Sequence, residues 1–292
     1  RQGIDPEETV SCGGGYRLGN RVFKCLGRHG PMDMRSAIMK SCNTYFYAMA
    51  NRVGFDAIAP VARELGLGQR FPLPFPSQSY GTVPDSAWKM KKYDDEWTRS
   101  DSLNAVIGQG YMIASPFQLA VMAARIASGR KLEPEIVLKK RAVGGALPYP
   151  AEHLQVVHDG MDMVVNGAGT AVASRLPLED VKMAGKTGTA QVKAIKGGFR
   201  GKGGVRKFRD HGLFVCYAPT VNPRYAASVV IEHGMGGARA AAPVAKDVLT
   251  FLYDREKAMA ALEELEAGWG GTIQERMDRQ YAAFLAAQGA TP

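Results

Sequence analysis

Long apolar runs are missing from this sequence. No stretch of about 18 apolar residues occurs, so no segment has the length and hydrophobicity of a membrane-spanning helix. A secretory leader is also missing, and the first residue is Arg1 rather than Met. We therefore expect a fragment or processed product, and these absences say little about the parent protein. Repeats of about 20–50 residues are absent too, which excludes solenoids and propellers.

Cysteine and acidic residues are scarce. Four cysteines in 292 residues are too few for a disulfide scaffold but enough for one metal site. Lys and Arg number 37 against 28 Asp and Glu, which leaves a net charge of +9. This excess invites an acidic partner, such as nucleic acid, an anionic membrane surface or an acidic substrate, and does not choose among them.

The remaining composition is that of a globular protein. A hydrophobic fraction of 46% and a charged fraction of 22% exclude disordered and collagen-like chains. The length suits one large domain or two small ones and is sufficient to bury a sizeable core.

Hydropathy patterns and capping residues divide the chain into expected elements. Before residue 170 we expect a hairpin over 16–24 and helices over 34–40, 44–53, 55–65, 116–128 and 151–166. Residues 67–102 are rich in Pro, Ser and charge and predict a long loop with small turns. Beyond residue 180 we expect strands over 181–192, 212–218 and 225–233, an apolar helix over 238–253 and a charged helical tail over 254–292.

The first motif with chemical content is Lys186-Thr187-Gly188-Thr189, on a predicted strand. Lys and Thr side chains beside an accessible strand edge can bind a carboxylate, and the glycine lets a substrate backbone lie against the strand. A Lys and a Thr on a solvated strand are the alternative interpretation.

The second motif is Ser41-Cys42-Asn43, at a predicted helix junction. A hydroxyl and an amide in this place can relay a proton and hold a peptide carbonyl. Ser and Asn are also ordinary helix-capping residues, and Ser102-Leu103-Asn104 repeats the spacing. Taken alone, the motif favours capping.

Longer runs make a family resemblance specific. These runs are I-G-Q-G-Y-x-x-A-S-P-x-Q-L-A at 107–120, A-G-K-T-G-T-A-Q-V at 184–192 and R-D-H-G-L-F-V-C-Y-A-P at 209–219, together with S-C-N before Tyr45-Phe46-Tyr47. With these motifs the chain resembles the transpeptidase domain of class B penicillin-binding proteins. The likeness covers residues 1 to about 253 in the expected order and leaves out the tail.

The resemblance implies an α+β fold, an antiparallel sheet flanked by helices, and a role for each motif residue. Ser41 would pass a proton to the leaving D-alanine, Asn43 would hydrogen-bond the substrate peptide, and Lys186 would support the proton network. Thr187 and Thr189 would bind the terminal carboxylate of a stem peptide or a β-lactam. The backbone N–H of Thr189 would supply half of an oxyanion hole.

One departure from the family is serious. The family nucleophile lies in a Ser-x-x-Lys motif before Ser-x-Asn, and no such motif precedes Ser41. Ser86-Ala87-Trp88-Lys89 has the spacing but follows Ser41, and we interpret it as a coincidence. We therefore expect residues 1–253 to be a partial transpeptidase domain that lacks its nucleophile and first strands and is inactive as a fragment.

Three of the cysteines gather near the start of the chain. Cys12, Cys25 and Cys42, with His29 between them, form a ligand set for tetrahedral structural zinc. A Cys12–Cys25 disulfide across the hairpin is an alternative, and free buried cysteines are another. Under the zinc hypothesis, the metal joins the hairpin to the Ser-x-Asn junction. The fourth cysteine, Cys216, is expected to pack in a core strand.

The other histidines, His153, His158, His211 and His233, show no metal spacing. We expect His211 and His233, which flank predicted strands, to be structural. The basic loop from Lys193 to Arg209 holds only Phe199 and Phe208 as aromatics, so a solvated loop beside the substrate-binding strand is favoured over a nucleic-acid site.

Several functions fit these observations. The preferred one, by resemblance, is a peptidoglycan D,D-transpeptidase of the cell-elongation machinery, at the periplasmic face of the bacterial inner membrane. Its implied partners are stem peptides, β-lactams, a membrane-embedded glycan polymerase and scaffold proteins, without nucleic acid. No catalytic cofactor is implied. A D,D-carboxypeptidase or β-lactamase, a non-catalytic binding module and a basic nucleic-acid binder are the alternatives.

Overall fold

The structure is a computed structural model that describes residues 3–74, 77–137, 144–192 and 205–288. It divides into two compact units, Arg1–Ala245 and Lys246–Pro292. Each unit is described by itself below. The candidate site residues all lie in the first unit.

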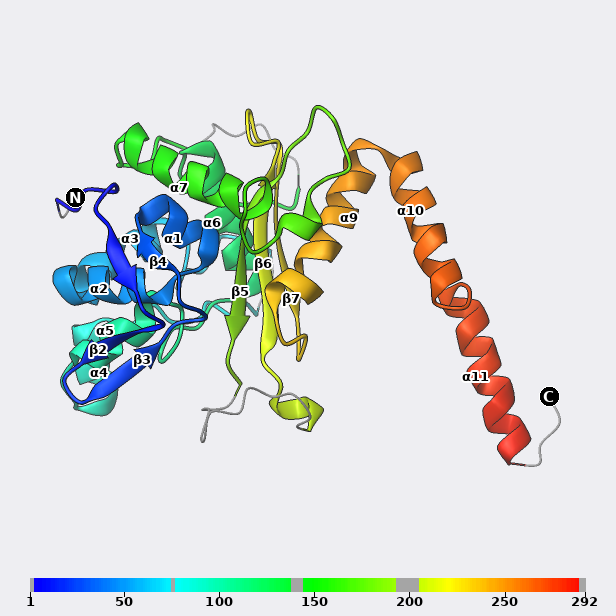
Figure 1. Cartoon of the computed structure of the whole chain (residues 1–292), viewed down its shortest axis with the longest axis horizontal. Helices are drawn as coiled ribbons and strands as arrows, with labels where there is room; N and C mark the ends of the chain where they lie inside the picture. Colours follow the sequence, from blue (N-terminus) through cyan, green and yellow to red (C-terminus); the bar gives the residue numbers. More distant parts are fainter. Residues whose placement is uncertain (1–2, 75–76, 138–143, 193–204, 289–292) are drawn as a thin grey trace. The chain divides into compact units, whose positions relative to one another are not determined.

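A three-stranded antiparallel sheet forms the centre of the first unit (Figure 1). Its order is β5 (Ala184–Ala190), β6 (His211–Ala218) and β7 (Tyr225–Ile231), with Lys186 opposite Val215 in the register. β6 and β7 are rich in the aromatic and β-branched residues that pack well in a sheet. The expected strands are confirmed, although β5 is shorter than the predicted 181–192.

Two long helices cover one side of this sheet (Figure 1). α6 (Pro116–Ser128) contacts β6 and β7, and α7 (Ala151–Val165) contacts β5. The predicted Ser115–Gln118 capping box starts α6, and Gly129 ends it in the left-handed conformation. The α+β fold class is therefore confirmed.

The predicted apolar helix over 238–253 is split into α8 (Gly237–Ala240) and α9 (Ala242–Tyr253). α8 begins directly against β5 and β6. A Cβ on Gly237 would lie 1.9 Å from the Leu213 carbonyl oxygen and 2.7 Å from that of Gly188. Only glycine fits this close backbone approach, which fixes the strand segment carrying the Lys-Thr-Gly motif.

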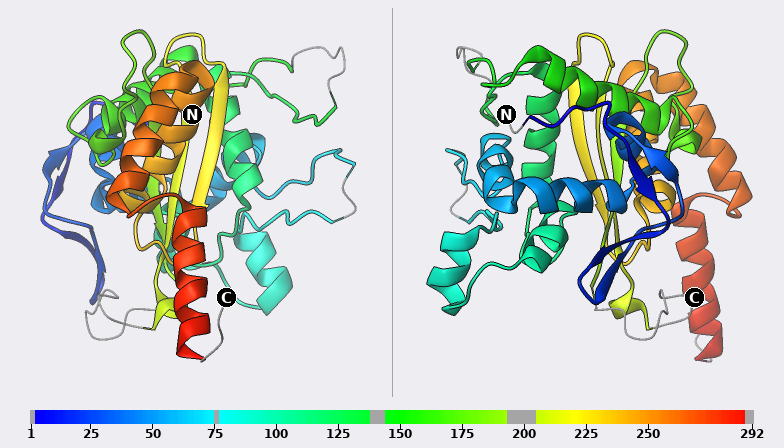
Figure 2. Two further views of the ribbon diagram at one scale, coloured as in Figure 1. Left: turned by 90° about the vertical axis from the view of Figure 1, so that its right-hand side faces the viewer. Right: turned by 60° about the vertical axis from the view of Figure 1, so that its left-hand side comes forward.

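Two small antiparallel pairs precede the helices. β2 (Gly15–Leu18) and β3 (Arg21–Lys24) form the predicted hairpin, which extends as an arm in Figure 2, and β1 (Val10–Cys12) pairs with β4 (Gly30–Met32). The arm is held because Phe23 is buried with Tyr47 and Leu103. The helices that follow are α1 (Met34–Lys40), α2 (Asn43–Val53) and α3 (Phe55–Glu64), close to the expected spans.

The prediction of a long loop over 67–102 is wrong. The segment contains α4 (Ser86–Tyr93), and α5 (Arg99–Val106) begins within it. Asp85 caps α4, and Thr98 forms a capping box with Asp101 at the start of α5. Both helices are short and polar, so their hydropathy shows no apolar stripe, and hydrogen bonds between side chains hold them in place.

The second unit contains the end of α9, then α10 (Arg255–Gly268) and α11 (Ile273–Ala287), as expected for a helical tail. Two single-turn 3₁₀ helices, Val172–Ser174 and Arg206–Phe208, complete the elements of the first unit. Among the described residues, no helix is both long and apolar enough to cross a membrane.

Candidate active site

The two sequence motifs meet in space through one hydrogen bond. Lys186, on β5, donates from its Nζ to the Oγ of Ser41 at 2.8 Å. Lys186 also donates to the carbonyl oxygen of Thr187 at 2.9 Å. The predicted Ser-x-Asn and Lys-Thr-Gly sites therefore share one location.

Ser41 is placed by the way α1 ends. It adopts the left-handed conformation, with φ 56° and ψ 48°. Its N–H donates to the carbonyl of Ile38, and that of Cys42 donates to the carbonyl of Ala37. This is a Schellman motif, in which glycine usually occupies the left-handed position. A serine here costs about 1–2 kcal/mol of backbone strain, and the turn aims its hydroxyl at Lys186.

Lys186 is partly exposed as a residue, but its ammonium group is almost enclosed. Desolvation by burial lowers the pKa of Lys186 to about 8. A lysine with this pKa exchanges its proton near neutral pH, which an ordinary lysine does not do. The group can therefore both donate to Ser41 and accept a proton from it.

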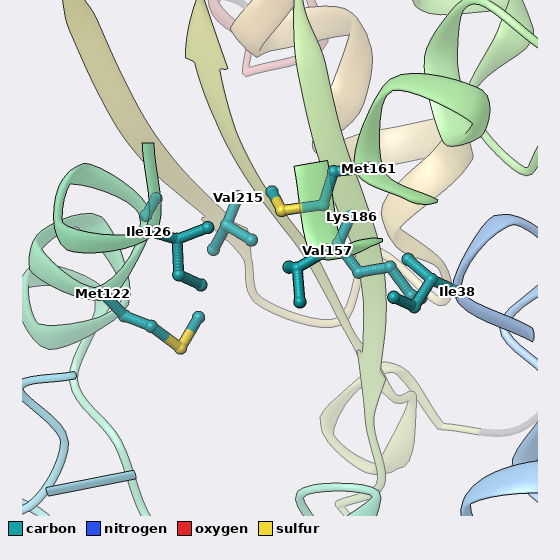
Figure 3. A pocket seen from close by; sticks show the side chains of 8 residues that line it. Ile38, Met122, Ile126, Val157, Met161, Lys186 and Val215 are labelled. Carbon is teal, nitrogen blue, oxygen red and sulfur yellow. The ribbon is translucent and has the colours of Figure 1, made fainter. Parts of the chain in front are cut away.

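An apolar pocket adjoins this lysine (Figure 3). It has a volume of about 200 Å³ and lies between α1, α6, α7 and the sheet. Figure 3 shows the Lys186 side chain extending from β5 toward Ile38 of α1. The remaining lining residues are apolar: Met122, Ala123, Ile126, Val157, Met161 and Val215. These walls desolvate the ammonium group and lower its pKa.

The other two strand residues have their own partners. The hydroxyl of Thr187 shares a hydrogen bond with the hydroxyl of Thr170, 2.7 Å away. The carbonyl oxygen of Thr189 accepts from the side-chain amide of Gln109 at 3.3 Å. Gln109 belongs to the Gly-Gln-Gly run, so this run lies against the motif strand. Thr189 itself is exposed.

Asn43 lies at the first turn of α2, two residues after Ser41. Its amide donates to the carbonyl oxygen of Lys24, at the end of β3, across 3.5 Å. Asn43 is thus close to Ser41, but its side-chain amide contacts the β2–β3 hairpin.

The matches at Ser86–Lys89 and Ser102–Asn104 have partners of their own within the fold. Ser86 donates from its hydroxyl to Asp56 at 2.6 Å, and Lys89 contacts Asp101 at 2.9 Å. The hydrogen bonds that Lys89 donates to Asp95 and Asp101 raise its pKa, so it stays charged. Ser102 is buried and accepts from the indole N–H of Trp97 at 2.8 Å.

The predicted metal ligands converge. The ligand atoms of Cys12, Cys25, His29 and Cys42 all lie within 4.8 Å of one another. The Sγ atoms of Cys25 and Cys42 are 3.9 Å apart, and His29 Nδ1 lies 3.6 Å from the Sγ atoms of Cys12 and Cys25. All four cysteines of the chain are free thiols, so the structure does not contain the alternative Cys12–Cys25 disulfide.

Three of the remaining histidines pack in the structure, whereas His153 is exposed. The ring of His158 lies against Tyr217, with Nε2 2.9 Å from the Ile126 carbonyl. The His211 and His233 rings lie 5.0 Å apart, where the His233 N–H donates to His211 Nδ1. The fourth cysteine, Cys216, is buried on β6. Most of the basic loop, residues 193–204, falls outside the described residues.

Two residues of the site were not among those predicted. Gln109 belongs to the Gly-Gln-Gly run that carries part of the family resemblance, but the sequence assigned it no role. Thr170 lies in a glycine-rich loop after α7, and no sequence motif points to it. Only the fold brings it to Thr187.

Comparison with known proteins gives a consistent result. The penicillin binding protein transpeptidase domain family matches residues 1–250. The peptidoglycan D,D-transpeptidase MrdA of Acinetobacter baumannii is 36% identical over 256 residues, which cover 81% of this chain and 37% of that protein. The chain thus spans about two fifths of the length of the curated relatives that it matches.

Solved structures agree. The structure of penicillin-binding protein PBP2 in complex with MreC from Helicobacter pylori matches with a TM-score of 0.76 and 28% identity, over 86% of this chain and 46% of that one. A structure describing the coordination of polymerization and crosslinking by a peptidoglycan synthase complex matches with a TM-score of 0.69 and 31% identity, over 85% of this chain and 42% of that one.

Proposed function

The chain belongs to the penicillin-binding protein transpeptidase family, and from this premise we propose that it serves a D,D-transpeptidase that cross-links the stem peptides of peptidoglycan. The observation that carries the proposal is the 2.8 Å hydrogen bond from Lys186 to Ser41. This bond joins the two motifs that the reaction needs, beside the pocket and the hydroxyl of Thr187.

The reaction is an acyl transfer. A serine oxygen attacks the carbonyl carbon between two D-alanines, the terminal D-alanine leaves with a proton, and the amine of a second stem peptide takes the acyl group from the ester. Ser41 delivers the proton to the leaving amine, and Lys186 resupplies it, because a pKa of about 8 permits exchange near neutral pH. No residue of this chain is assigned as the nucleophile.

Substrate binding falls to β5 and to Asn43. The hydroxyls of Thr187 and Thr189 bind the terminal carboxylate of the stem peptide or of a β-lactam, and Gly188 leaves room for the peptide beside the strand. The N–H of Thr189 stabilises the oxyanion. Asn43 hydrogen-bonds the peptide, which requires its amide to leave the weak 3.5 Å contact with Lys24.

The relatives support a proposal for the cellular setting. We propose that the protein carrying this chain works at the periplasmic face of the inner membrane, with a membrane-embedded glycan polymerase and a scaffold protein of the elongation machinery. This proposal is supported by the two structural neighbours, one of which is a complex with MreC and the other a peptidoglycan synthase complex.

Non-covalent binding tests the function on this chain. Saturation-transfer NMR would compare acetyl-D-Ala-D-Ala with acetyl-L-Ala-L-Ala, in the unaltered chain and in the Lys186→Met variant. We expect stereoselective binding that Lys186→Met weakens about tenfold. Lys182→Met, at an exposed lysine just before β5, is the matched control and should bind as the unaltered chain does. Equal binding of the two enantiomers would contradict the proposal.

We further propose that Cys12, Cys25, His29 and Cys42 hold a structural zinc ion. A tetrahedral site with Zn–S of about 2.3 Å and Zn–N of about 2.0 Å requires S–S separations of about 3.8 Å and S–N separations of about 3.6 Å. Three of the six separations, 3.9 Å for one S–S pair and 3.6 Å for two S–N pairs, meet that requirement, and the other three are within 4.8 Å. Three thiolates and one imidazole leave no open position, so the ion would support structure and not chemistry.

This metal would position the candidate active site. Cys42 directly follows Ser41, Cys25 follows β3, and His29 precedes β4. One ion would therefore hold the two small sheets to the left-handed turn that carries Ser41. Metal analysis of protein purified without chelator is expected to give about one zinc per chain, and a stoichiometry near zero would contradict the proposal.

A further inference from the structure

We infer that Thr170 is a positioning residue for carboxylate recognition: its hydroxyl donates to Thr187 and so turns the Thr187 proton toward the bound carboxylate. This inference rests on the proposed function of the site. The observation behind it is the 2.7 Å hydrogen bond between the two hydroxyl groups.

The direction of this bond decides what Thr187 can do. A hydroxyl group has one proton, so two hydroxyls in contact either point the Thr187 proton at Thr170 or leave it free. A carboxylate only accepts hydrogen bonds. When it binds, the favoured arrangement is a chain in which Thr170 donates to Thr187 and Thr187 donates to the carboxylate. Such chains polarise each bond and strengthen both.

Hydrogen bonds from Arg175 and Asn166 fix the loop that carries Thr170. The guanidinium of Arg175 donates to three consecutive carbonyls, those of Val165, Asn166 and Gly167, at 2.8–3.0 Å. The Asn166 amide donates to the Met183 carbonyl, directly before β5, at 2.9 Å. The loop and the motif strand are therefore fixed to each other.

The loop is also held from the side of Ser41. Lys40, the residue before Ser41, donates to the Ala168 carbonyl at 2.5 Å. A Cβ at Gly169 would lie 2.3 Å from the Cα of Val164, so only glycine permits this close return of the chain. Hydrogen bonds from Arg175, Asn166 and Lys40 thus fix this loop. Thr170 supplies its hydroxyl group at the site.

The test compares two ligands that differ only at the C-terminus, acetyl-D-Ala-D-Ala and its C-terminal amide, by saturation-transfer NMR. The unaltered chain is expected to prefer the acid. Thr170→Val keeps the shape of the side chain but removes the hydroxyl, and it should weaken acid binding on the order of tenfold while leaving amide binding unchanged. Thr170→Ser should restore the preference. Thr220→Val, in the turn beyond β6, is the matched control and should change neither.

Each other result is decisive. A Thr170→Val variant that keeps the full acid preference, or that loses acid and amide binding equally, would overturn the inference, since the second pattern is that of a general structural role. A Thr170→Ser variant that fails to recover would overturn it as well. If the unaltered chain itself does not distinguish acid from amide while Thr170 is intact, the proposed function fails and the inference with it.

Discussion

Lys186 and Ser41 lie 145 residues apart in the chain, and their side chains meet at 2.8 Å. The described residues give Lys186 no acidic partner, so desolvation alone shifts its pKa. A buried carboxylate would have kept the lysine permanently charged. The site instead pairs a poised ammonium group with a hydroxyl held in a strained turn, which suits a proton relay.

The lowered pKa of Lys186 makes stability depend on pH. Below about pH 8 the lysine is charged in both folded and unfolded chains, and the full cost of burying the charge applies. Between pH 8 and 10.5 the folded chain has lost the proton and the unfolded chain keeps it, so the cost fades as pH rises. We expect the free energy of unfolding of the unaltered chain to rise by up to about 3 kcal/mol, relative to that of Lys186→Met, as the pH increases across this range.

Urea unfolding of both proteins at several pH values between 7 and 10.5 checks this expectation. Lys182→Met is the control: the difference between its free energy of unfolding and that of the unaltered chain should not change with pH. NMR titration of the Lys186 side chain provides a second measurement. A midpoint near 10.5 would show that the pocket does not desolvate the ammonium group.

The left-handed turn at Ser41 predicts an unusual pair of variants. Ser41→Ala and Ser41→Gly both remove the hydroxyl, but only glycine adopts φ 56° without strain. We expect Ser41→Gly to be about 1 kcal/mol more stable than Ser41→Ala in thermal or urea unfolding. Both variants should lose the Lys186 contact alike. Equal stability of the two variants would mean that the turn relaxes in solution.

Local chemistry predicted much of this fold. The capping box at Ser115, the hairpin and the helix over 34–40 were evident because each depends on residues within a few positions. α4 and α5 were missed because their support comes from charge pairs such as Lys89–Asp101, although the Thr98–Asp101 capping box was a signal in the sequence.

The site was predictable to a similar degree. The convergence of three cysteines and His29 followed from their closeness in sequence and the hairpin between them. The Ser41–Lys186 pairing came from family resemblance, since no local rule joins residues 145 apart. Thr170 is a single hydroxyl in a glycine-rich loop, and its meeting with Thr187 depends on how α7 packs beside β5.

Metal removal is expected to loosen the first unit. If zinc joins β1, β3 and the start of α2, then chelation leaves three thiols and an imidazole without their common partner. We expect the melting temperature to fall by about 5–10 °C with a strong chelator, and Cys42→Ser to show the same fall without chelator.

The fourth cysteine supplies the control for this experiment. Cys216→Ala removes a buried thiol far from the cluster in sequence and should leave both the metal content and the chelator effect unchanged. A melting temperature that is indifferent to chelator in the unaltered chain would contradict a structural metal.

Covalent labelling tests whether this chain acylates by itself. No Ser-x-x-Lys motif precedes Ser41, and two follow it. The one at 86–89 is engaged elsewhere, with Ser86 bonded to Asp56 and Lys89 to Asp95 and Asp101. In the one at 128–131, the Ser128 hydroxyl donates to the Ala124 carbonyl within its own helix. A charged lysine between two carboxylates cannot take a proton from a nucleophile.

We therefore expect fluorescent penicillin to leave no covalent band on a denaturing gel, while a penicillin-binding enzyme with an intact motif labels in parallel. A band that Ser86→Ala abolishes would show that α4 rearranges into a reactive site, and a band that Ser41→Ala abolishes would make Ser41 itself the nucleophile, because its hydroxyl already lies against a lysine whose pKa of about 8 suits a base.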